Sequence, residues 1–411
     1  MNDHKSGFRK FLLLWMGELI SSIGGGLTSF GLAVYVFNET GSAASMAVVS
    51  LLAFLPTLLL SVPAGVLADR HDRRLLMMIG DGFSGLGIVY ILLCMLGGGA
   101  SLLQICIGVS ISSVFSALLE PSYRATITEM LTEEEYSKAS GMVSLAGSAR
   151  YLVSPVLAGL LLAVSDIKLL LFIDICTFAF TVITTAVVKK GIVSRKPVSQ
   201  ESFFSSIADG WKAITEKKGL FVLIMVSSLI TCFMGTLQIL VEPMVLDFSD
   251  STTLGVTETV CACGMLVSSF ILGVKGIKSR YVTVLSLSLA FAGLAMAVFG
   301  LKQNIYLMCI AGFLFFAMLP FANSCLDYLA RINIPEEKQG RAWGLIGFLS
   351  QLGYVVAYGL SGILADGIAA IRNISVGRGA AWVVIAAGVL MCLTSVSLSF
   401  MGSVKKLERK D

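Results

Sequence analysis

The stretch GVLADRHDRR, Gly65–Arg74, lies between two long apolar runs. Its last six residues are three arginines, one histidine and two aspartates. Hydrophobic residues make up 56% of the 411 positions and charged residues only 14%, and the mean hydropathy is +0.87. Soluble globular chains average about 45 to 50% apolar and about 25% charged residues. The sequence therefore predicts an integral membrane protein in which this charged stretch is a loop between two spans.

The apolar segments on either side of such polar stretches are each long enough to cross a hydrocarbon core of about 30 Å. Helices are the only open-ended elements that satisfy their backbone hydrogen bonds there. We therefore expect an all-α membrane protein with twelve transmembrane helices in two pseudo-symmetric six-helix bundles. The expected spans are 11–37, 42–65, 75–97, 101–120, 138–163, 168–188, 219–246, 253–274, 281–301, 304–330, 341–365 and 379–402.

The longest polar stretch falls midway along the chain and carries seven basic residues. It predicts an N-terminal bundle over 1–188, a cytoplasmic linker over 189–218 and a C-terminal bundle over 219–411. Within the linker, apolar residues from Phe203 to Ile214 recur at helical spacing, and we expect an interfacial helix there.

The basic residues are distributed unevenly between the two sides of the predicted membrane. If the tails and the loops after every second span share one side, that side holds 25 of the 30 Lys and Arg residues, and the other holds four. Basic residues in short loops stay in the cytoplasm. We expect a protein of the bacterial inner membrane with both termini in the cytoplasm. We expect no cleaved signal peptide, since no small-residue cleavage site follows the first apolar run.

The two halves contain a short internal repeat. A shift of 203 residues aligns LTEEEYSKASG, Leu131–Gly141, with IPEEKQGRAWG, Ile334–Gly344. The same shift places Tyr151 on Tyr354 and Gly159 on Gly362. Duplicated halves are typical of transporters, so the repeat indicates two copies of one six-helix unit.

The charged loop now gains a more specific interpretation. It resembles the signature G-x-x-x-D-R-x-G-R-R/K of the major facilitator superfamily, with Asp72 in place of the second glycine. Together with FLP, TGSA, MMIGD, YLVSP and QGRAWGLIG, it is similar to the macrolide-efflux branch of the drug:proton antiporters. The resemblance implies two bundles that expose a central site alternately to each side. The residues that match the loop signature are Gly65, Asp69, Arg70, Arg73 and Arg74.

Two motifs carry expectations about gating. The resemblance implies that Asp69 accepts hydrogen bonds from Arg73 and from the helix that begins near Arg341, which would latch the cytoplasmic side. The alternative explanation of the loop's arginines is topological, because basic residues hold a short loop on the cytoplasmic side of the membrane. In the fifth span, Ser154, Pro155 and Gly159 resemble the proline and glycine motif of antiporters in weakened form. Close helix packing without a role in coupling is the alternative.

Ionisable side chains inside spans are energetically costly and indicate function. We expect Asp81 and Asp327 to reach water near cytoplasmic ends, whereas Arg150 lies deep and needs a carboxylate partner, either Glu120 or Glu18. These deep charges form either a structural ion network or a site for a polar substrate, with one carboxylate exchanging protons. The candidates for substrate or proton binding are Glu18, Glu120, Arg150, Asp174, Glu242 and Glu258.

The remaining residues indicate adaptable apolar contact and no metal or cofactor. The nine cysteines lie in apolar segments, and Cys261 and Cys263 point apart on a helix, so we expect no metal site. No phosphate-binding loop of the G-x-x-x-x-G-K-S/T type is present, so ATP is not expected as the energy source. The apolar candidates for substrate contact are Trp15, Phe30, Tyr35, Met234, Phe316 and Tyr354.

The sequence thus predicts a monomeric secondary transporter that exports amphipathic drugs or related small molecules by proton antiport. We expect a small amphipathic substrate, protons and membrane lipids as partners and no nucleic acid. No nucleophile and base constellation indicates an enzyme. A lipid or lysophospholipid translocator is the alternative, because Arg150 would suit a phosphate headgroup. A membrane sensor is a weaker alternative, because it would predict a sizeable soluble domain.

Overall fold

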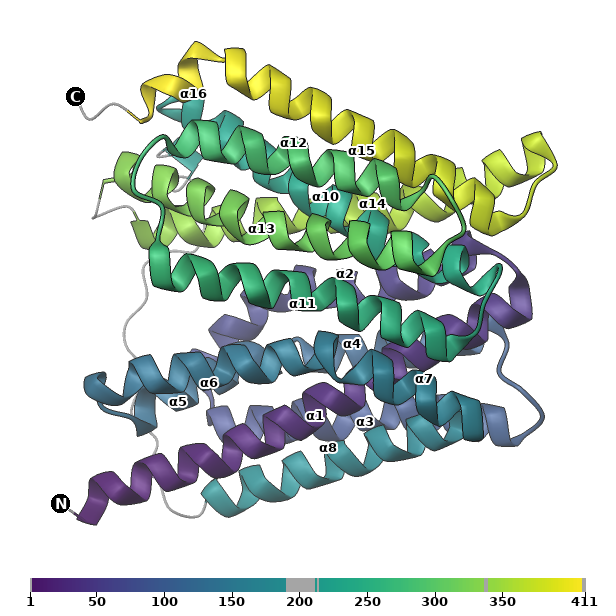
Figure 1. Ribbon diagram of the computed structural model, residues 1–411. Coiled ribbons are helices and arrows are strands. Elements are labelled where there is room, and N and C mark those ends of the chain that lie inside the picture. Colours follow the sequence, from purple (N-terminus) through teal and green to yellow (C-terminus); the bar gives the residue numbers. More distant parts are fainter. Residues whose placement is uncertain (1, 190–210, 213, 336–338, 409–411) are drawn as a thin grey trace. The chain divides into compact units, whose positions relative to one another are not determined.

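The computed structural model describes residues 2–189, 211–212, 214–335 and 339–408, and these residues are helical without strands (Figure 1). In this part of the chain, twelve segments are long and apolar enough to cross a membrane. The expectation of an all-α membrane protein with twelve spans is confirmed. The chain divides into two compact units. Unit 1 comprises Met1–Thr40 and Val48–Ser199, and unit 2 comprises Gly41–Ala47 and Gln200–Asp411.

Unit 1 contains two broken spans. The fourth span, Leu102–Met130, consists of two helices, and so does the fifth, Lys138–Val164. Each break precedes a proline, Pro121 or Pro155, which cannot donate the hydrogen bond that would continue the helix. The helices are α1 (Asn2–Thr40), α2 (Ala43–Arg70), α3 (Arg73–Leu96), α4 (Leu102–Ser116), α5 (Leu119–Met130), α6 (Glu133–Leu152), α7 (Ser154–Val164) and α8 (Ile167–Lys189).

The membrane spans of unit 2 are unbroken helices. Figure 1 shows α12, α13 and α15 lying side by side. Although α10 and α13 contain Pro243 and Pro320, both continue for 29 residues. The helices are α10 (Lys218–Leu246), α11 (Ser251–Lys275), α12 (Tyr281–Phe299), α13 (Ile305–Asn333), α14 (Gln339–Arg372), α15 (Val376–Phe400) and the short α16 (Gly402–Lys406).

Side-chain caps fix where several helices begin. Asp72 accepts hydrogen bonds from the backbone N–H groups of Arg74 and Leu75 and thereby caps α3. This explains an aspartate where the family signature has glycine. Asp250 caps α11 in the same way, and the backbone N–H of Thr253 lowers the pKa of its carboxyl. The charged loops therefore define helix starts as well as orientation.

A seam of small residues joins α1 to α8 in unit 1. Gly17 packs against Thr181 and Thr184, and Gly24 packs against Thr177 and Asp174. A side chain at either glycine would overlap these atoms, so only glycine allows the two helices to approach this closely. The seam brings a row of threonine hydroxyls and one carboxylate into the interior of unit 1.

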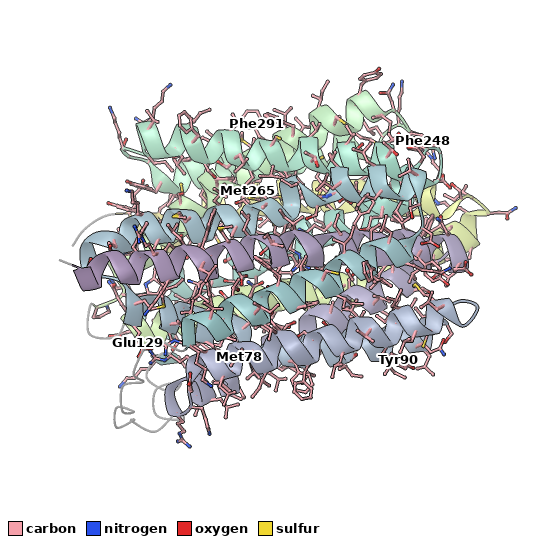
Figure 2. All side chains as sticks on the ribbon, turned by 90° about the horizontal axis from the view of Figure 1, so that it is seen from below. Met78, Tyr90, Glu129, Phe248, Met265 and Phe291 are labelled. Carbon is pink, nitrogen blue, oxygen red and sulfur yellow. The ribbon has the colours of Figure 1, made fainter. Side chains whose placement is uncertain are left out.

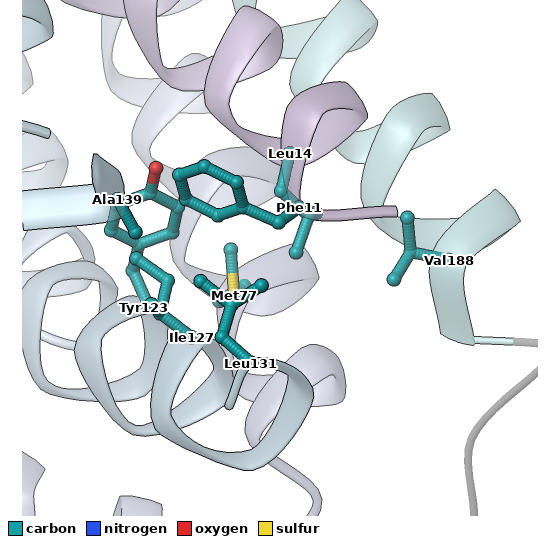
Figure 3. Packing of buried hydrophobic residues seen from close by; sticks show 8 residues of the cluster. All are labelled: Phe11, Leu14, Met77, Tyr123, Ile127, Leu131, Ala139 and Val188. Carbon is teal, nitrogen blue, oxygen red and sulfur yellow. The ribbon is translucent and has the colours of Figure 1, made fainter. Parts of the chain in front are cut away.

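A hydrophobic cluster closes one end of unit 1 (Figure 3). We call this the tail end, where α1 and α3 begin and α5 and α8 end. The cluster consists of Phe11, Leu14, Met77, Tyr123, Ile127, Leu131, Ala139 and Val188, all at most 9% exposed. It separates the polar interior of unit 1 from the charged loops beyond its tail end.

The predicted interfacial helix falls largely on residues 190–210 and 213, outside the described part of the chain. Within the described residues, Ile214 is fully buried and packs in unit 2 with Leu220 and Ile346. Trp211 remains 47% exposed beside the ring of Phe221. Ile214 therefore belongs to the core of unit 2, because its side chain completes an apolar cluster there. The interfacial helix stays a prediction.

Candidate functional site

The two deepest charges of unit 1 lie at the breaks in its helices. Glu120 is in the first turn of α5, and Arg150 is in the last turn of α6. The N-terminus of a helix carries partial positive charge and its C-terminus partial negative charge. Each side chain thus lies at the helix end that favours its charge. The breaks lower the free-energy cost of charged groups in the middle of these spans.

Arg150 and Glu120 have different partners from those predicted. Arg150 Nη2 donates to Ser29 Oγ on α1 at 2.8 Å, whereas Glu120 Oε1 accepts from Arg124 Nη2 at 2.8 Å. Among the described residues Arg150 forms no ion pair with a carboxylate. The predicted pairing of Arg150 with Glu120 or Glu18 is therefore wrong as a direct contact. Arg124 is one helical turn from Glu120 on the same face of α5 and reaches it first.

Glu18 nevertheless belongs to the same electrostatic group. It is half-buried on α1, its carboxylate is hydrogen-bonded to Ser22, and it interacts electrostatically with both Glu120 and Arg150. Unit 1 therefore brings together the three deep charges that the sequence singled out, without joining them by ion pairs in its described part.

Asp174 occupies the seam between α1 and α8. It is 1% exposed, and its carboxylate accepts hydrogen bonds from Thr28 Oγ1 at 2.6 Å and Thr177 Oγ1 at 3.2 Å. Hydroxyl donors on both sides compensate part of the cost of removing this carboxylate from water. Asp174 is thus a well-supported carboxylate that ties α1 to α8.

Unit 2 contains a pair of carboxylates. Glu242 on α10 and Glu258 on α11 are both half-buried and interact electrostatically with each other. No ion pair to either is present among the residues that the structure describes. Two like charges in one low-dielectric region repel each other, so the pair favours binding of a cation or a proton.

The charged loop after α2 is anchored to α5. Arg74 is only 2% exposed, and its Nη2 lies 3.1 Å from Glu129 Oε2. Arg73 lies 3.8 Å from the same oxygen and donates to the backbone oxygen of Ala125 at 3.1 Å. Figure 2 shows Glu129 at one end of unit 1. Glu129 was not predicted from the sequence, although its position opposite the basic loop at the tail end was a usable signal.

The other members of the gate motif are only partly described. Gly65 is half-buried near the end of α2, and Arg70 is exposed at its last residue. The side chains of Asp69 and Arg341 lie outside the part of the chain that the structure describes. The predicted latch of Asp69 onto the start of α14 therefore stays a prediction.

The motif of the fifth span packs α7 against α1. Ser154 is fully buried and donates from Oγ to the backbone oxygen of Ile23 at 3.0 Å. Gly26 faces Ser154 and leaves no room for a side chain, while Pro155 begins α7 and Gly159 is buried. The structure shows the close packing, and a role of the motif in coupling stays a prediction.

An aromatic and polar patch lies between α10 and α14 of unit 2. Tyr354 Oη donates to Met234 Sδ at 3.1 Å, and Tyr358 Oη donates to Gln238 Oε1 at 3.3 Å. The two tyrosine rings are 5.7 Å apart, and Gly235 leaves room for both of them on α10. We call these four side chains the Tyr–Met patch. Met234 and Tyr354 were candidates from the sequence, whereas Gln238 and Tyr358 were missed.

The other apolar candidates have varied environments. Phe30 is 4% exposed and belongs to the core, and Trp15 Nε1 donates to the backbone oxygen of Met142 at 2.6 Å. Phe316 packs on the ring of Phe315. Packing therefore accounts for these three side chains. Tyr35, on α1, hydrogen-bonds to the backbone of Ala100 and lines a cavity of about 510 Å³ in unit 1.

The first turn of α2 carries a cap that was not predicted from the sequence. Asp366 on α14 accepts hydrogen bonds from the backbone N–H groups of Ala43 and Ala44, each at 3.0 Å, and from Ser42 Oγ at 2.7 Å. Gly362 packs directly on the backbone of Ala43. Both segments belong to unit 2, although the rest of α2 belongs to unit 1. We call this contact the α2 cap.

The described residues contain no group of three or more His, Cys, Asp or Glu side chains arranged to hold a metal ion. The nine cysteines are free thiols, and Cys261 and Cys263 differ in burial. The polar groups available for function are thus carboxylates, Arg150 and hydroxyls.

The sequence profile of the Major Facilitator Superfamily matches residues 14–358. The chain belongs to this superfamily. Macrolide efflux protein A of Streptococcus pyogenes is 25% identical over 417 residues, with all of both chains covered. The uncharacterized MFS-type transporter YfiS of Bacillus subtilis (strain 168) is 24% identical over 377 residues, 87% of each chain.

The fold of a solved transporter is similar over nearly the whole length. The crystal structure of a mutant of the nucleoside transporter NupG has a TM-score of 0.75 at 13% sequence identity, covering 95% of this chain and 100% of that one. This likeness concerns the fold alone. As a member of the major facilitator superfamily, the protein is a multi-pass membrane transporter of small molecules, and the family and its relatives indicate no enzyme.

Proposed function

We propose that this transporter exports amphipathic small molecules of the macrolide type in exchange for protons, by alternating access in a bacterial inner membrane. The observation that carries the proposal is the group of ionisable side chains inside the spans of unit 1, Glu18, Glu120 and Arg150, of which the last two lie at helix breaks. The full-length similarity to macrolide efflux protein A supports the substrate class.

Carboxylates in spans supply the coupling chemistry. A carboxylate enclosed away from water binds a proton more tightly than one in contact with water. In an antiporter, a proton and a cationic substrate compete for such a group, so proton entry drives substrate exit. Glu18 in unit 1 and the pair Glu242 and Glu258 in unit 2 are candidates for this exchange.

The Tyr–Met patch supplies adaptable apolar contact. Met234 is unbranched and polarisable, and the rings of Tyr354 and Tyr358 combine a large apolar face with a hydroxyl. Gln238 adds a side-chain amide beside the rings. Such a surface suits a substrate with a large apolar body and scattered hydroxyl or carbonyl groups.

The α2 cap fixes the start of α2 within unit 2. The hydrogen bonds from Ser42, Ala43 and Ala44 to Asp366 hold this segment on α14. The excess of basic residues on the side of the tails favours cytoplasmic termini, which places the start of α2 at the external side.

Arg150 favours a second candidate, a translocator of lipids or lysophospholipids. Its guanidinium donates to a hydroxyl rather than to a carboxylate among the described residues, and the side chain is exposed. An arginine with five donors and one such bond suits a phosphate headgroup. In that case the carboxylates of unit 1 balance charge and carry no protons.

Proteoliposomes with an imposed pH gradient test the two candidates. Macrolides, cationic dyes and lysophospholipids are added in turn, and the internal pH is followed with a trapped dye. We expect a drug-dependent collapse of the gradient that Glu18→Gln abolishes and that the matched control Glu39→Gln, at an exposed site, leaves intact. Movement of lysophospholipids alone, without a pH change, would contradict export by proton exchange.

A further inference from the structure

Asp81 on α3 is an interior carboxyl that the proposed exchange does not yet use. From the sequence both Asp81 and Asp327 were expected to reach water near the ends of their spans, and Asp327 is exposed. That expectation is wrong for Asp81, which is 2% exposed, with no hydrogen-bond partner for Oδ2 among the described residues. Met77, one turn nearer the tail end on α3, belongs to the hydrophobic cluster of Figure 3, which lies between Asp81 and that end.

The packing register places Asp81 among other polar groups. Gly85 packs on Phe178 of α8, and Gly17 packs on Thr181 and Thr184. Because α8 runs antiparallel to both α1 and α3, a position one turn before Gly85 lies level with the segment from Thr181 to Thr185. Glu18, which follows Gly17, lies at the same level.

Two hydroxyls near this level are also buried and without partners in the described residues. Thr185 Oγ1 is fully buried, and Tyr123, at 5% exposed, has an unpartnered Oη. Figure 3 shows the ring of Tyr123 within the hydrophobic cluster. Tyr123 also interacts electrostatically with Glu18. Hydroxyl and carboxyl oxygens from α3, α5 and α8 thus face one interior region of unit 1.

The charges around Asp81 do not balance if every acid is ionised. Asp81 interacts electrostatically with Glu18 on α1 and Asp174 on α8. From α5 the titratable neighbour is Tyr123, and α4 carries only Cys106. Arg150 is the base that interacts with Glu18 and Asp174. Glu120 is already neutralised by Arg124. Three carboxylates therefore share one guanidinium inside the membrane, where unbalanced charge is costly.

Hydrogen bonding distinguishes the three acids. Asp174 accepts hydrogen bonds from two threonine hydroxyls, and the carboxylate of Glu18 is hydrogen-bonded to Ser22. Asp81 Oδ2 has no donor directed at it in the described residues. A buried carboxylate without a donor keeps an uncompensated charge, whereas the neutral acid leaves only an uncharged polar group without a partner, at lower cost. The environment of Asp81 is suited to the protonated form.

We propose that Asp81 is a proton-binding site in the interior of unit 1, occupied by a proton in this conformation. The unpartnered hydroxyls of Thr185 and Tyr123 are polar groups of the same interior region, and neither is hydrogen-bonded to Asp81 Oδ2 in this conformation. The proton is taken from water and returned to water when the hydrophobic cluster at the tail end opens. The use of this proton in export rests on the proposed proton exchange, whereas its presence on Asp81 does not.

Infrared difference spectroscopy of the purified full-length protein in lipid tests the site directly. A protonated carboxylic acid gives a carbonyl stretch that an ionised carboxylate lacks and that shifts in deuterated water. At neutral pH we expect this band in the wild-type protein, its loss in Asp81→Asn and its persistence in the control Glu39→Gln. Loss of carboxylate bands alone in Asp81→Asn would overturn the proposal.

Two further variants keep the test informative if Asp81→Asn folds poorly. Asp81→Glu retains an acid and should retain a band at a shifted position. Thr185→Val makes the interior region around Asp81 less polar and should shift the band of Asp81 without abolishing it. A band unchanged in both variants would show that the protonated acid lies elsewhere and would refute the site.

The spectra need neither a substrate nor a pH gradient, so their outcome is independent of the export proposal. If export proves proton-coupled, Asp81→Asn should retain downhill movement of drug and lose pH-driven accumulation. Full pH-driven accumulation by this variant would show that the proton on Asp81 takes no part in transport.

Discussion

The fifth span of unit 1 and the corresponding span of unit 2 have diverged at equivalent positions. Under the 203-residue repeat, Arg150 corresponds to Gly353 and Pro155 to Tyr358. In unit 1 the span breaks between α6 and α7, and Arg150 lies in the last turn of the first piece. In unit 2, α14 continues for 34 residues, and Gly353 packs against the backbone of Ser228. At this equivalent position, unit 1 has the charged Arg150, and unit 2 has Gly353 at a close contact between two helices.

This difference separates two tasks between the units. Proline breaks in unit 1 create helix ends that stabilise charge within the membrane. Glycine contacts in unit 2 hold α10 and α14 close together, and the aromatic patch follows from that contact at Tyr354 and Tyr358. The comparison favours charge at helix breaks as the contribution of unit 1, and apolar contact with the substrate through the Tyr–Met patch as the contribution that unit 2 makes besides its carboxylate pair.

The largest expected effect is on the close contact of unit 2. Gly353→Leu places a side chain against Ser228 and Thr231 of α10. Overpacking of this kind costs about 1 to 3 kcal/mol or more, and here the opposing atoms include backbone. We expect a large fall in the thermal unfolding temperature of the detergent-solubilised protein. Gly359→Ala, at a position with open space, is the matched control, and equal stability of the two variants would refute the close contact.

The next largest effect is expected at Arg150, the residue of unit 1 that corresponds to Gly353 of unit 2. Arg150→Gln retains a hydrogen-bond donor but removes the positive charge in the last turn of α6. We expect export to fall by about tenfold or more while stability changes little, because Arg150 is exposed. Lys302→Gln in an exposed loop serves as the control. Normal export by Arg150→Gln would show that the charge of Arg150 takes no part in export.

A smaller effect is expected at the α2 cap. Asp366→Asn keeps the shape of the side chain but removes the charge that faces the start of α2, and loss of a helix cap costs about 0.5 to 2 kcal/mol. We expect amide hydrogen exchange at Ala43 and Ala44 to become about 2- to 30-fold faster. Asp166→Asn, in a loop of unit 1, should leave these amides unchanged. Unaltered exchange in Asp366→Asn would contradict the cap.

The smallest effect concerns Glu120. Its ion pair with Arg124 is exposed, and such pairs contribute about 1 kcal/mol or less. A double-mutant cycle on stability should therefore give weak coupling between Glu120 and Arg124, and still weaker coupling between Glu120 and Arg150. Strong coupling between Glu120 and Arg150 would restore the ion pair that the sequence suggested.

Much of the fold was predictable because span length and hydropathy depend on local sequence. The number and order of spans and the basic loop around Arg73 and Arg74 followed from composition and spacing. The internal repeat was visible for the same reason.

The pairing of side chains was less predictable because it depends on breaks and distant contacts. Glu120 pairs with Arg124 one helical turn away on α5, a local pair that the search for a deep partner of Arg150 did not consider. Asp366 and its partner Ala43 are 323 positions apart, so no local pattern joins them. The burial of Asp81 likewise depends on the glycines that bring α1 and α3 close to α8.

Glu18 of unit 1 is proposed to take part in proton exchange, and the Tyr–Met patch of unit 2 is proposed to contact the substrate. The most direct test is the ratio of protons to drug moved in proteoliposomes by the wild type, by Glu18→Gln and by Tyr358→Phe. We predict a changed ratio in Glu18→Gln, and in Tyr358→Phe an unchanged ratio with a higher drug concentration at half-maximal rate. A changed ratio in Tyr358→Phe together with an unchanged ratio in Glu18→Gln would contradict this division of tasks.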